Sequence, residues 1–299
     1  LDLIAAYSHG PGPRSAAPTT AERTAAARDI AASLGVDWSH AAPADLALDG
    51  EIEHADLDEE FWTALPVLEH IRTAARSRRT APTAVLGSVL ARASALIPPS
   101  TCVPPFVGGT VPLSIIVALV ATTGGSKSAT DRVAADILTN TPPGVGGPFA
   151  LGSGEGAAEA YLERHTAKDD NGKNVTRQRQ VKYGVIFTLD EGRVLTELGS
   201  RSGSTIVPTL CTMWTGGDPG RMNASAETRR TLPVGGYTFG LVSLWQPSRM
   251  DGLFDDTDGG LPGRFLFLGI TDPDVPETRP EFPGPLDWTL PAWIAHEGV

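Results

Sequence analysis

The sequence predicts an α/β fold: a mostly parallel β-sheet flanked by helices, with a helical extension on its N-terminal side. Three observations predict it. From residue 111 onward, apolar runs of strand length alternate with helical stretches, as is typical of a parallel sheet covered by helices. The most apolar run, residues 111–120, contains Pro112 and Ser114 and is too short to span a bilayer, which indicates a buried strand. Before residue 100, apolar residues recur at helical spacing.

The sequence divides into four segments. Residues 1–58 are rich in Ala, Pro, Asp and Glu and are expected to be flexible or loosely helical. Residues 59–110 are expected to form a helical subdomain, in which a second helix over 84–96 ends before two prolines. Residues 111–275 contain the sheet, and residues 276–299 form a Pro-rich tail. The first helix has one apolar face, made of Phe61, Leu65, Leu68, Ile71 and Ala75.

The elements of the sheet region follow from the same patterns. Further strands are expected over 183–189, 237–245 and 264–270, and helices over 128–139, from about Gly156, and over 204–213. Loops are expected over 141–149, 166–177 and 214–232.

Composition narrows the function classes. A formal net charge of -11 excludes bulk attraction to nucleic acid or anionic membrane, so contact with DNA requires a local basic patch or a partner subunit. The two cysteines, Cys102 and Cys211, match no metal or redox spacing, which favours a reducing compartment. The start does not resemble a signal peptide, and it lacks Met, as a piece of a longer protein would. We expect a cytoplasmic protein with no membrane partner.

A phosphate site is predicted where the strand at 115–120 leads into Ala121-Thr-Thr-Gly-Gly-Ser-Lys-Ser128. This is the layout of a P-loop, in which backbone N–H groups surround phosphate oxygens. Lys127 would reach the β and γ phosphates of ATP, and the Ser128 hydroxyl would coordinate Mg²⁺. The full motif has glycine where Ala121 and Ser126 stand, so a variant P-loop and a plain Gly-Ser-Lys turn both remain open. The predicted nucleotide-binding residues are Thr123, Gly124, Gly125, Ser126, Lys127, Ser128 and Ala129.

A second element favours the P-loop interpretation. The apolar strand at 183–189 ends in Asp190 and Glu191, which is the Walker B pattern. Asp190 would hold Mg²⁺ through water, and Glu191 would polarise the attacking water. The alternative is a strand that ends in a solvated acidic turn. The order of the two motifs along the chain favours the first.

Two further residues are candidates for catalysis. Gln246, at the tip of the strand at 237–245, has the position of a γ-phosphate sensor, and otherwise simply ends the strand. Arg264 precedes the last strand and would neutralise charge as a finger, in cis or across a subunit interface. Its alternative role is an ion pair with the acidic run at 255–258.

Three weaker features have a structural alternative that we favour. Glu155 would be an additional acid near the water, or a first-turn carboxylate stabilised by the helix dipole. The basic cluster at 72–79 would contact DNA, or would simply be the basic C-terminus of a helix. The loop at 221–230 would contact DNA, or would be a solvated surface loop.

The ordered set of motifs resembles the uncharacterised P-loop ATPases of phage, plasmid and integrated-element replication proteins, which are often joined to primase–polymerase domains. The resembling segments are 61–72, 111–128, 152–156, 190–191, 201–205, 214–216, 246–247 and 258–266. The resemblance implies a P-loop NTPase of the RecA/helicase type, Mg-ATP as ligand, and a role in mobile-element DNA replication as a ring or beside a primase. It also implies site roles for Lys127, Ser128, Asp190, Glu191, Gln246 and Arg264.

Three functions therefore stay open at this point. The first is a DNA-dependent ATPase, and the second is a P-loop scaffold that binds nucleotide poorly because of the substituted turn. The third is a small-molecule kinase, which shares the first two motifs but needs an arginine-rich lid. Only Arg229 and Arg230 are candidates for such a lid, so the kinase ranks last.

Overall fold

The computed structural model describes residues 57–103, 109–122, 126–168, 172, 174–220, 230–254, 260–272 and 274–289. All of them belong to one compact unit, His54–Val299. The expectation for residues 1–58 falls outside this set except at its last two positions.

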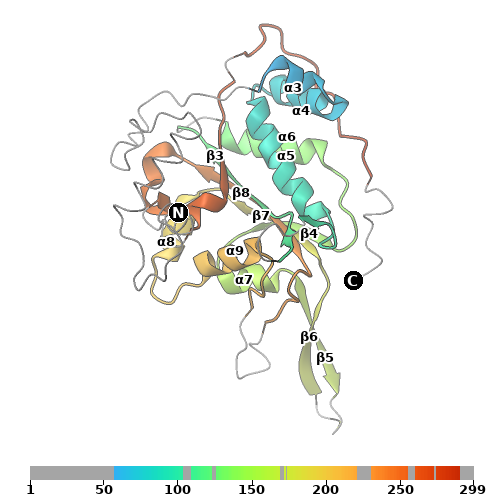
Figure 1. Cartoon of the computed structure of the whole chain (residues 1–299), viewed down its shortest axis with the longest axis vertical. Coiled ribbons are helices and arrows are strands. Elements are labelled where there is room, and N and C mark those ends of the chain that lie inside the picture. The colour runs from blue at the N-terminus through green and yellow to red at the C-terminus, as the bar shows by residue number, and fades with distance from the viewer. Residues whose placement is uncertain are drawn as a thin grey trace, which may run out of the picture. The chain divides into compact units, whose positions relative to one another are not determined.

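A five-stranded sheet forms the centre of the unit (Figure 1), and its strand order is β4-β7-β8-β3-β9. Every neighbouring pair is parallel, which confirms the predicted α/β fold with a parallel sheet. The central strand β8 is buried along its whole length and separates β3 from β7. The strands are β3 (Ile115–Val120), β4 (Val145–Ala150), β7 (Gly184–Leu189), β8 (Thr238–Trp245) and β9 (Phe265–Gly269).

One face of the sheet is covered by α5 (Pro82–Leu96) and α6 (Lys127–Ile137). Alternate residues of β3 point to this face, where Val117 and Leu119 pack with alanines of α5. The helix lies so close to the sheet that a β-carbon on Gly240 would stand 1.7 Å from the Ala91 carbonyl oxygen. Glycine in β8 therefore sets the distance between helix and sheet.

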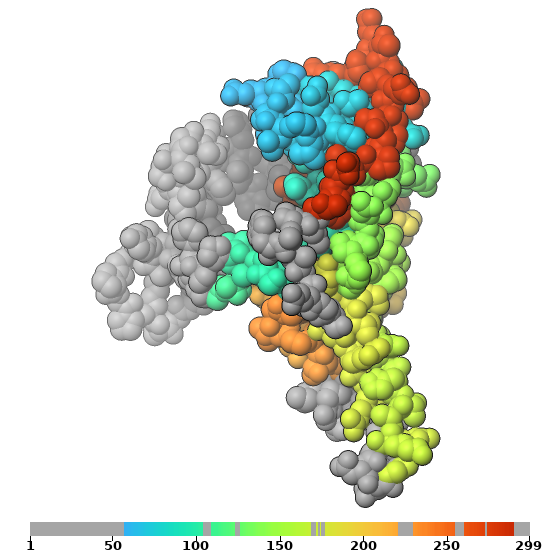
Figure 2. Space-filling view, turned by 90° about the vertical axis from the view of Figure 1, so that its right-hand side faces the viewer, coloured from blue at the N-terminus to red at the C-terminus, as the bar shows by residue number. Residues whose placement is uncertain are grey.

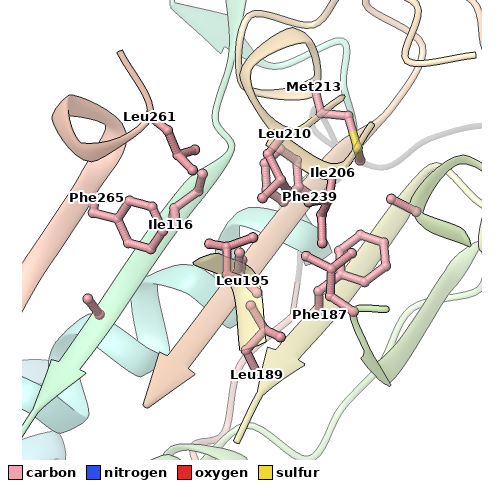
Figure 3. Close-up of a cluster of buried hydrophobic side chains, with 14 of the residues drawn as sticks. Ile116, Phe187, Leu189, Leu195, Ile206, Leu210, Met213, Phe239, Leu261 and Phe265 are labelled. Carbon is pink, nitrogen blue, oxygen red and sulfur yellow. The ribbon is translucent and has the colours of Figure 1, made fainter. Parts of the chain in front are cut away.

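The opposite face carries most of the apolar core (Figure 3). Phe187 and Phe239, from β7 and β8, meet Leu195, Ile206 and Leu210 from the helices on that side. These helices are α7 (Gly154–Glu159), α8 (Arg193–Gly199), α9 (Ile206–Trp214) and α10 (Asp251–Phe254). The chain crosses from β3 to β4 with α6 on the first face. It then returns over the second face through β7 and β8, and passes β3 to reach β9. Right-handed crossovers require this change of face when the direction reverses.

The predicted first helix is two helices, α3 (Glu59–Thr63) and α4 (Pro66–Ser77). Pro66 occupies the first turn of α4, where its missing N–H costs nothing, and this starts a new helix. Leu65 precedes it with 55% of its surface exposed, so it is not part of one continuous apolar face.

Two expected loops contain strands. β4 begins inside the loop expected over 141–149 and ends one residue beyond it. It is an edge strand with a bulge between Gly146 and Phe149, which suits its Gly-Gly-Pro sequence. The loop expected over 166–177 lies in an antiparallel hairpin of β5 (Leu162–Lys168) and β6 (Asn174–Gln180). The expected strand over 111–120 is also interrupted, because β2 (Val111–Pro112) pairs with β1 (Cys102–Val103) before β3 begins.

A C-terminal segment without helix or strand, residues 272–289, runs beside α3 and α4 (Figure 2). Phe282 and Leu286 pack against the cluster that α4 shares with α5 and α6. The Leu286 backbone N–H also donates to the Ile137 carbonyl at the end of α6, at 2.8 Å. Among the described residues, no helix is both long and apolar enough to cross a membrane.

Candidate nucleotide site at the carboxyl edge of the sheet

A small hollow lies at the carboxyl edge of the sheet, where the polar side chains that follow β7 and β8 meet the start of α6. Its volume is about 130 Å³, which is the scale of a phosphate group rather than of a whole nucleotide. Open α/β sheets bind ligands at this edge, beside the strands where the chain reverses direction. The hollow is lined by Lys127, Asp190, Glu191, Gly192, Arg193, Leu244, Gln246 and Arg249.

Lys127 is the first residue of α6, directly after the turn that follows β3. Its Nζ donates to the carbonyl oxygens of Ala121 and Thr122, at 3.0 Å each, so the ammonium closes the turn. Partial burial lowers the pKa of Lys127, because desolvation disfavours the charged form. Ser126 is the N-cap of α6 but its side chain makes no capping hydrogen bond. Residues 123–125, which include three of the predicted phosphate-binding positions, lie outside the described residues.

Asp190 and Glu191 follow β7 in an exposed turn. Two contacts with β8 hold this turn. The Gly192 N–H donates to the Leu244 carbonyl oxygen at 2.7 Å, and Gly192 packs on the buried indole of Trp245. Glu191 lies 3.9 Å from the Arg193 guanidinium in a solvent-exposed pair. Asp190 and Lys127 thus face one hollow although β8 separates their strands.

Ser128 and Asp190, the two predicted magnesium ligands, both line an adjoining hollow of about 440 Å³. Magnesium favours one or two protein oxygens completed by water and phosphate, so a hydroxyl and a carboxylate fit this ion. The described residues contain no group of three His, Cys, Asp or Glu side chains that would hold a metal by themselves. Ala129 follows Ser128 on α6 and is exposed.

A buried ion pair supports the same helix. Arg92 of α5 donates to both carboxylate oxygens of Asp131, at 3.3 and 2.8 Å, and only 7% of the Arg92 side chain is exposed. Asp131 lies one turn after Lys127 on α6, so the pair holds the start of α6 against α5. Neither residue belongs to a motif that the sequence shows.

Gln246 follows β8 and lines the hollow as expected, and it is joined by a residue that the sequence analysis missed. The 3-10 turn η2 (Pro247–Arg249) brings the chain back, so that Arg249 also lines the hollow. Arg193, from the first turn of α8, does the same. The short spacing between Gln246 and Arg249 was the feature of the sequence that could have indicated that Arg249 lies near Gln246.

Arg264 is not brought to this hollow. It ends the 3-10 turn η3 (Pro262–Arg264), immediately before β9, and therefore lies at the amino edge of the sheet, opposite Lys127. Its guanidinium donates to the Gly260 carbonyl oxygen and stacks over Trp214 at 5.4 Å. A finger role in cis is therefore wrong on geometric grounds, because a five-residue strand spans roughly 16 Å. The acidic run proposed as its partner lies outside the described residues.

Glu155 lies in the first turn of α7, after the edge strand β4, with two strands between β4 and β3. The Ser153 hydroxyl caps this helix by accepting from the Gly156 N–H at 3.0 Å. Glu155 does not line the hollow.

The basic cluster at 72–79 is used inside the fold. Arg72 pairs with Glu59, and Arg76 pairs with Asp272 at 3.1 Å. Arg79 donates to the carbonyl oxygens of residues 276 and 277, and Arg78 stacks over Phe282. Arg76, Arg78 and Arg79 therefore hold the C-terminal segment, and Arg72 joins α4 to α3. Most of the other basic candidate, residues 221–229, lies outside the described residues, and Arg230 pairs with Glu159 at 2.8 Å.

No protein-family model and no curated protein sequence matches the chain. The geometry of the site and the order of its motifs therefore carry the functional argument.

Proposed function

We propose that the chain is an ATP-binding P-loop ATPase of the RecA/helicase type that acts in the DNA replication of a mobile element. The observation that carries the proposal is the shared hollow of Lys127 and Asp190. A cation at the start of a helix and a carboxylate at the end of a nearby strand are the two groups that a magnesium-bound triphosphate requires. A cytoplasmic location and a ring of identical subunits or a primase partner belong to the same proposal.

The residues of this hollow and of the adjoining one would divide the work of phosphoryl transfer. Lys127 would leave the turn carbonyls and bind the β and γ phosphates, while Ser128 and Asp190 would hold Mg²⁺. The bound ion neutralises charge on the β and γ oxygens. Glu191, exposed at the rim, would accept a proton from the attacking water, and Gln246 would orient that water.

Arg249 takes the charge-neutralising role that the sequence assigned to Arg264. It lines the hollow beside Gln246, and a guanidinium there would donate to the oxygens of the transferred phosphoryl group. Arg264 keeps a finger role only if a second subunit receives it.

One observation favours a second candidate, a P-loop scaffold that binds nucleotide poorly. Two of the three donors of the Lys127 ammonium are already used by carbonyl oxygens, so only one is left for a phosphate unless those bonds break. The Ser126 side chain adds bulk at a position where the full motif has glycine.

Calorimetry with ATP, with and without Mg²⁺, separates the two candidates. The ATPase requires Mg-dependent binding that Lys127→Ala and Asp190→Asn weaken, and turnover that Lys127→Ala abolishes and single-stranded DNA increases. Arg201→Gln, an exposed change outside the hollow, is the matched control. Absence of ATP binding in a stably folded oligomer would select the scaffold. Ser126→Gly then tests whether the turn before Lys127 limits ATP affinity. If it does, this substitution should strengthen ATP binding.

A further inference from the structure

The β5–β6 hairpin projects from the body of the unit as a two-stranded ribbon (Figures 1 and 2). Seven residue pairs join its strands, from Leu162 opposite Gln180 to Lys168 opposite Asn174. Neither strand pairs with the central sheet. An isolated two-stranded ribbon is only marginally stable in water, so this arm depends on its attachment to the body.

The base of the arm is firmly attached. Tyr161, fully buried immediately before β5, donates through its hydroxyl to the Thr238 carbonyl oxygen at 2.8 Å. Its own carbonyl accepts from the Val181 N–H at 2.9 Å, just after β6. The Gln180 amide adds a bond to the Gly236 carbonyl oxygen at 2.8 Å. The arm is therefore held in a fixed direction.

The arm is basic although the chain is acidic. Between residues 162 and 180 the sequence has five Lys or Arg and three Asp or Glu, against a net charge of -11 for the whole chain. Two of the arginines are matched by carboxylates, since Arg164 pairs with Glu159 and Arg179 pairs with Glu163. Lys168 and Arg177 are exposed and form no ion pair with another described residue.

We propose that this hairpin is a DNA-binding arm that contacts the phosphate backbone through Lys168 and Arg177. A two-stranded β-ribbon fits the major groove of duplex DNA, and Lys and Arg provide the phosphate contacts. None of the hairpin side chains whose exposure is described is a large exposed apolar one. Protein interfaces usually have aromatic or aliphatic side chains at their centre, so a nucleic acid suits this surface better than a second protein. The choice of DNA rests on the proposed function, whereas the basic arm itself does not.

The test measures binding of the full chain to a labelled dT 30-mer and to a 30-base-pair duplex by fluorescence anisotropy, without ATP. At 0.1 M salt each lost phosphate contact should weaken binding on the order of tenfold. The double variant Lys168→Gln/Arg177→Gln should also lower the slope of log K against log salt by about 1.8 for the duplex, or about 1.4 for the single strand. Arg201→Gln is the control for Arg177→Gln, because it removes one exposed arginine outside the hairpin, and it should bind DNA as the wild type does.

A charge-retaining variant keeps the inference falsifiable. Lys168→Arg/Arg177→Lys should bind DNA like the wild type, because the contact depends on charge rather than shape. Three results would each overturn the DNA-binding role of the arm. The first is wild-type affinity and salt slope in the Gln variants, and the second is no DNA binding by the wild type. The third is that the Gln variants lose self-association instead of DNA binding. Failure of ATP binding leaves these measurements unchanged, so the two proposals fail separately.

Discussion

Gly192 lies directly on the indole ring of Trp245: a β-carbon at position 192 would stand 2.1 Å from two atoms of that ring. The Trp245 Nε1–H donates to the Ser243 hydroxyl at 2.8 Å, and that hydroxyl donates to the Val117 carbonyl oxygen at 2.8 Å. Two hydrogen bonds in series therefore tie the ring to β3. The turn that presents Asp190 and Glu191 is thus held against the strand that leads to Lys127.

Gly192→Ala should lower the free energy of unfolding by about 1–3 kcal/mol, because overpacking forces the turn or the ring to shift. It should also weaken Mg-dependent ATP binding. Urea denaturation and calorimetry measure the two effects. Gly203→Ala is a poor control because Gly203 has a positive φ, whereas Gly152→Ala has open space around the new carbon and should leave stability nearly unchanged. Equal stability of Gly192→Ala and the wild type would contradict the packing argument.

Nucleotide binding should depend on pH through Lys127. Burial lowers the pKa of this ammonium in the free protein below its ordinary value, and bound phosphate favours the charged form. ATP affinity should therefore be full below the lowered pKa and fall as pH rises through it. Lys127→Arg keeps its charge throughout the alkaline range. A similar alkaline loss of affinity in Lys127→Arg would assign the titration to another group.

Arg249→Gln should reduce kcat by roughly 100-fold or more with little change in ATP affinity, because its donors act on charge that develops during transfer. Arg264→Gln should leave kcat within about twofold and reduce thermal stability, since it removes the contact with Trp214. Steady-state kinetics and thermal denaturation compare the two variants. The reverse ranking of kcat would point to Arg264 acting across a subunit interface.

Arg92→Met should destabilise the fold by about 2–3 kcal/mol, since it leaves the Asp131 carboxylate without its partner in a partly buried place. The double variant Arg92→Met/Asp131→Leu should recover much of that loss, because removing both charges removes the uncompensated one. Urea denaturation of the single and double variants measures the coupling. Additive losses would mean that the pair contributes no interaction energy.

The apolar runs were enough to predict four of the five strands of the sheet. The strand before Lys127 is apolar throughout and the strand before Asp190 is apolar except at Thr188, and in the structure both strands pair with β8. β4 was mistaken for a loop because two glycines and a proline within it are ordinary turn residues. The hairpin was missed because polar side chains cover both its faces, which removes the alternation that indicates a strand.

The composition of the site could be predicted only in part. Lys127, Asp190 and Gln246 follow strands, so the parallel order of the sheet brings them to one edge. Arg249 reaches the hollow through the turn η2, which spacing along the chain does not reveal. Arg264 directly precedes β9, so the parallel direction of that strand places it at the amino edge of the sheet.

The segment 272–289 has a consequence for how the chain reaches its native state. Its residues supply the partners of Arg76 and Arg79 and part of the apolar cover of α4 and α6, elements made much earlier in the chain. During translation the packing of α4 and α6 stays incomplete until Phe282 and Leu286 have been synthesised. The packing of these helices is therefore complete only after residue 286 has left the ribosome, and until then part of their apolar surface is uncovered.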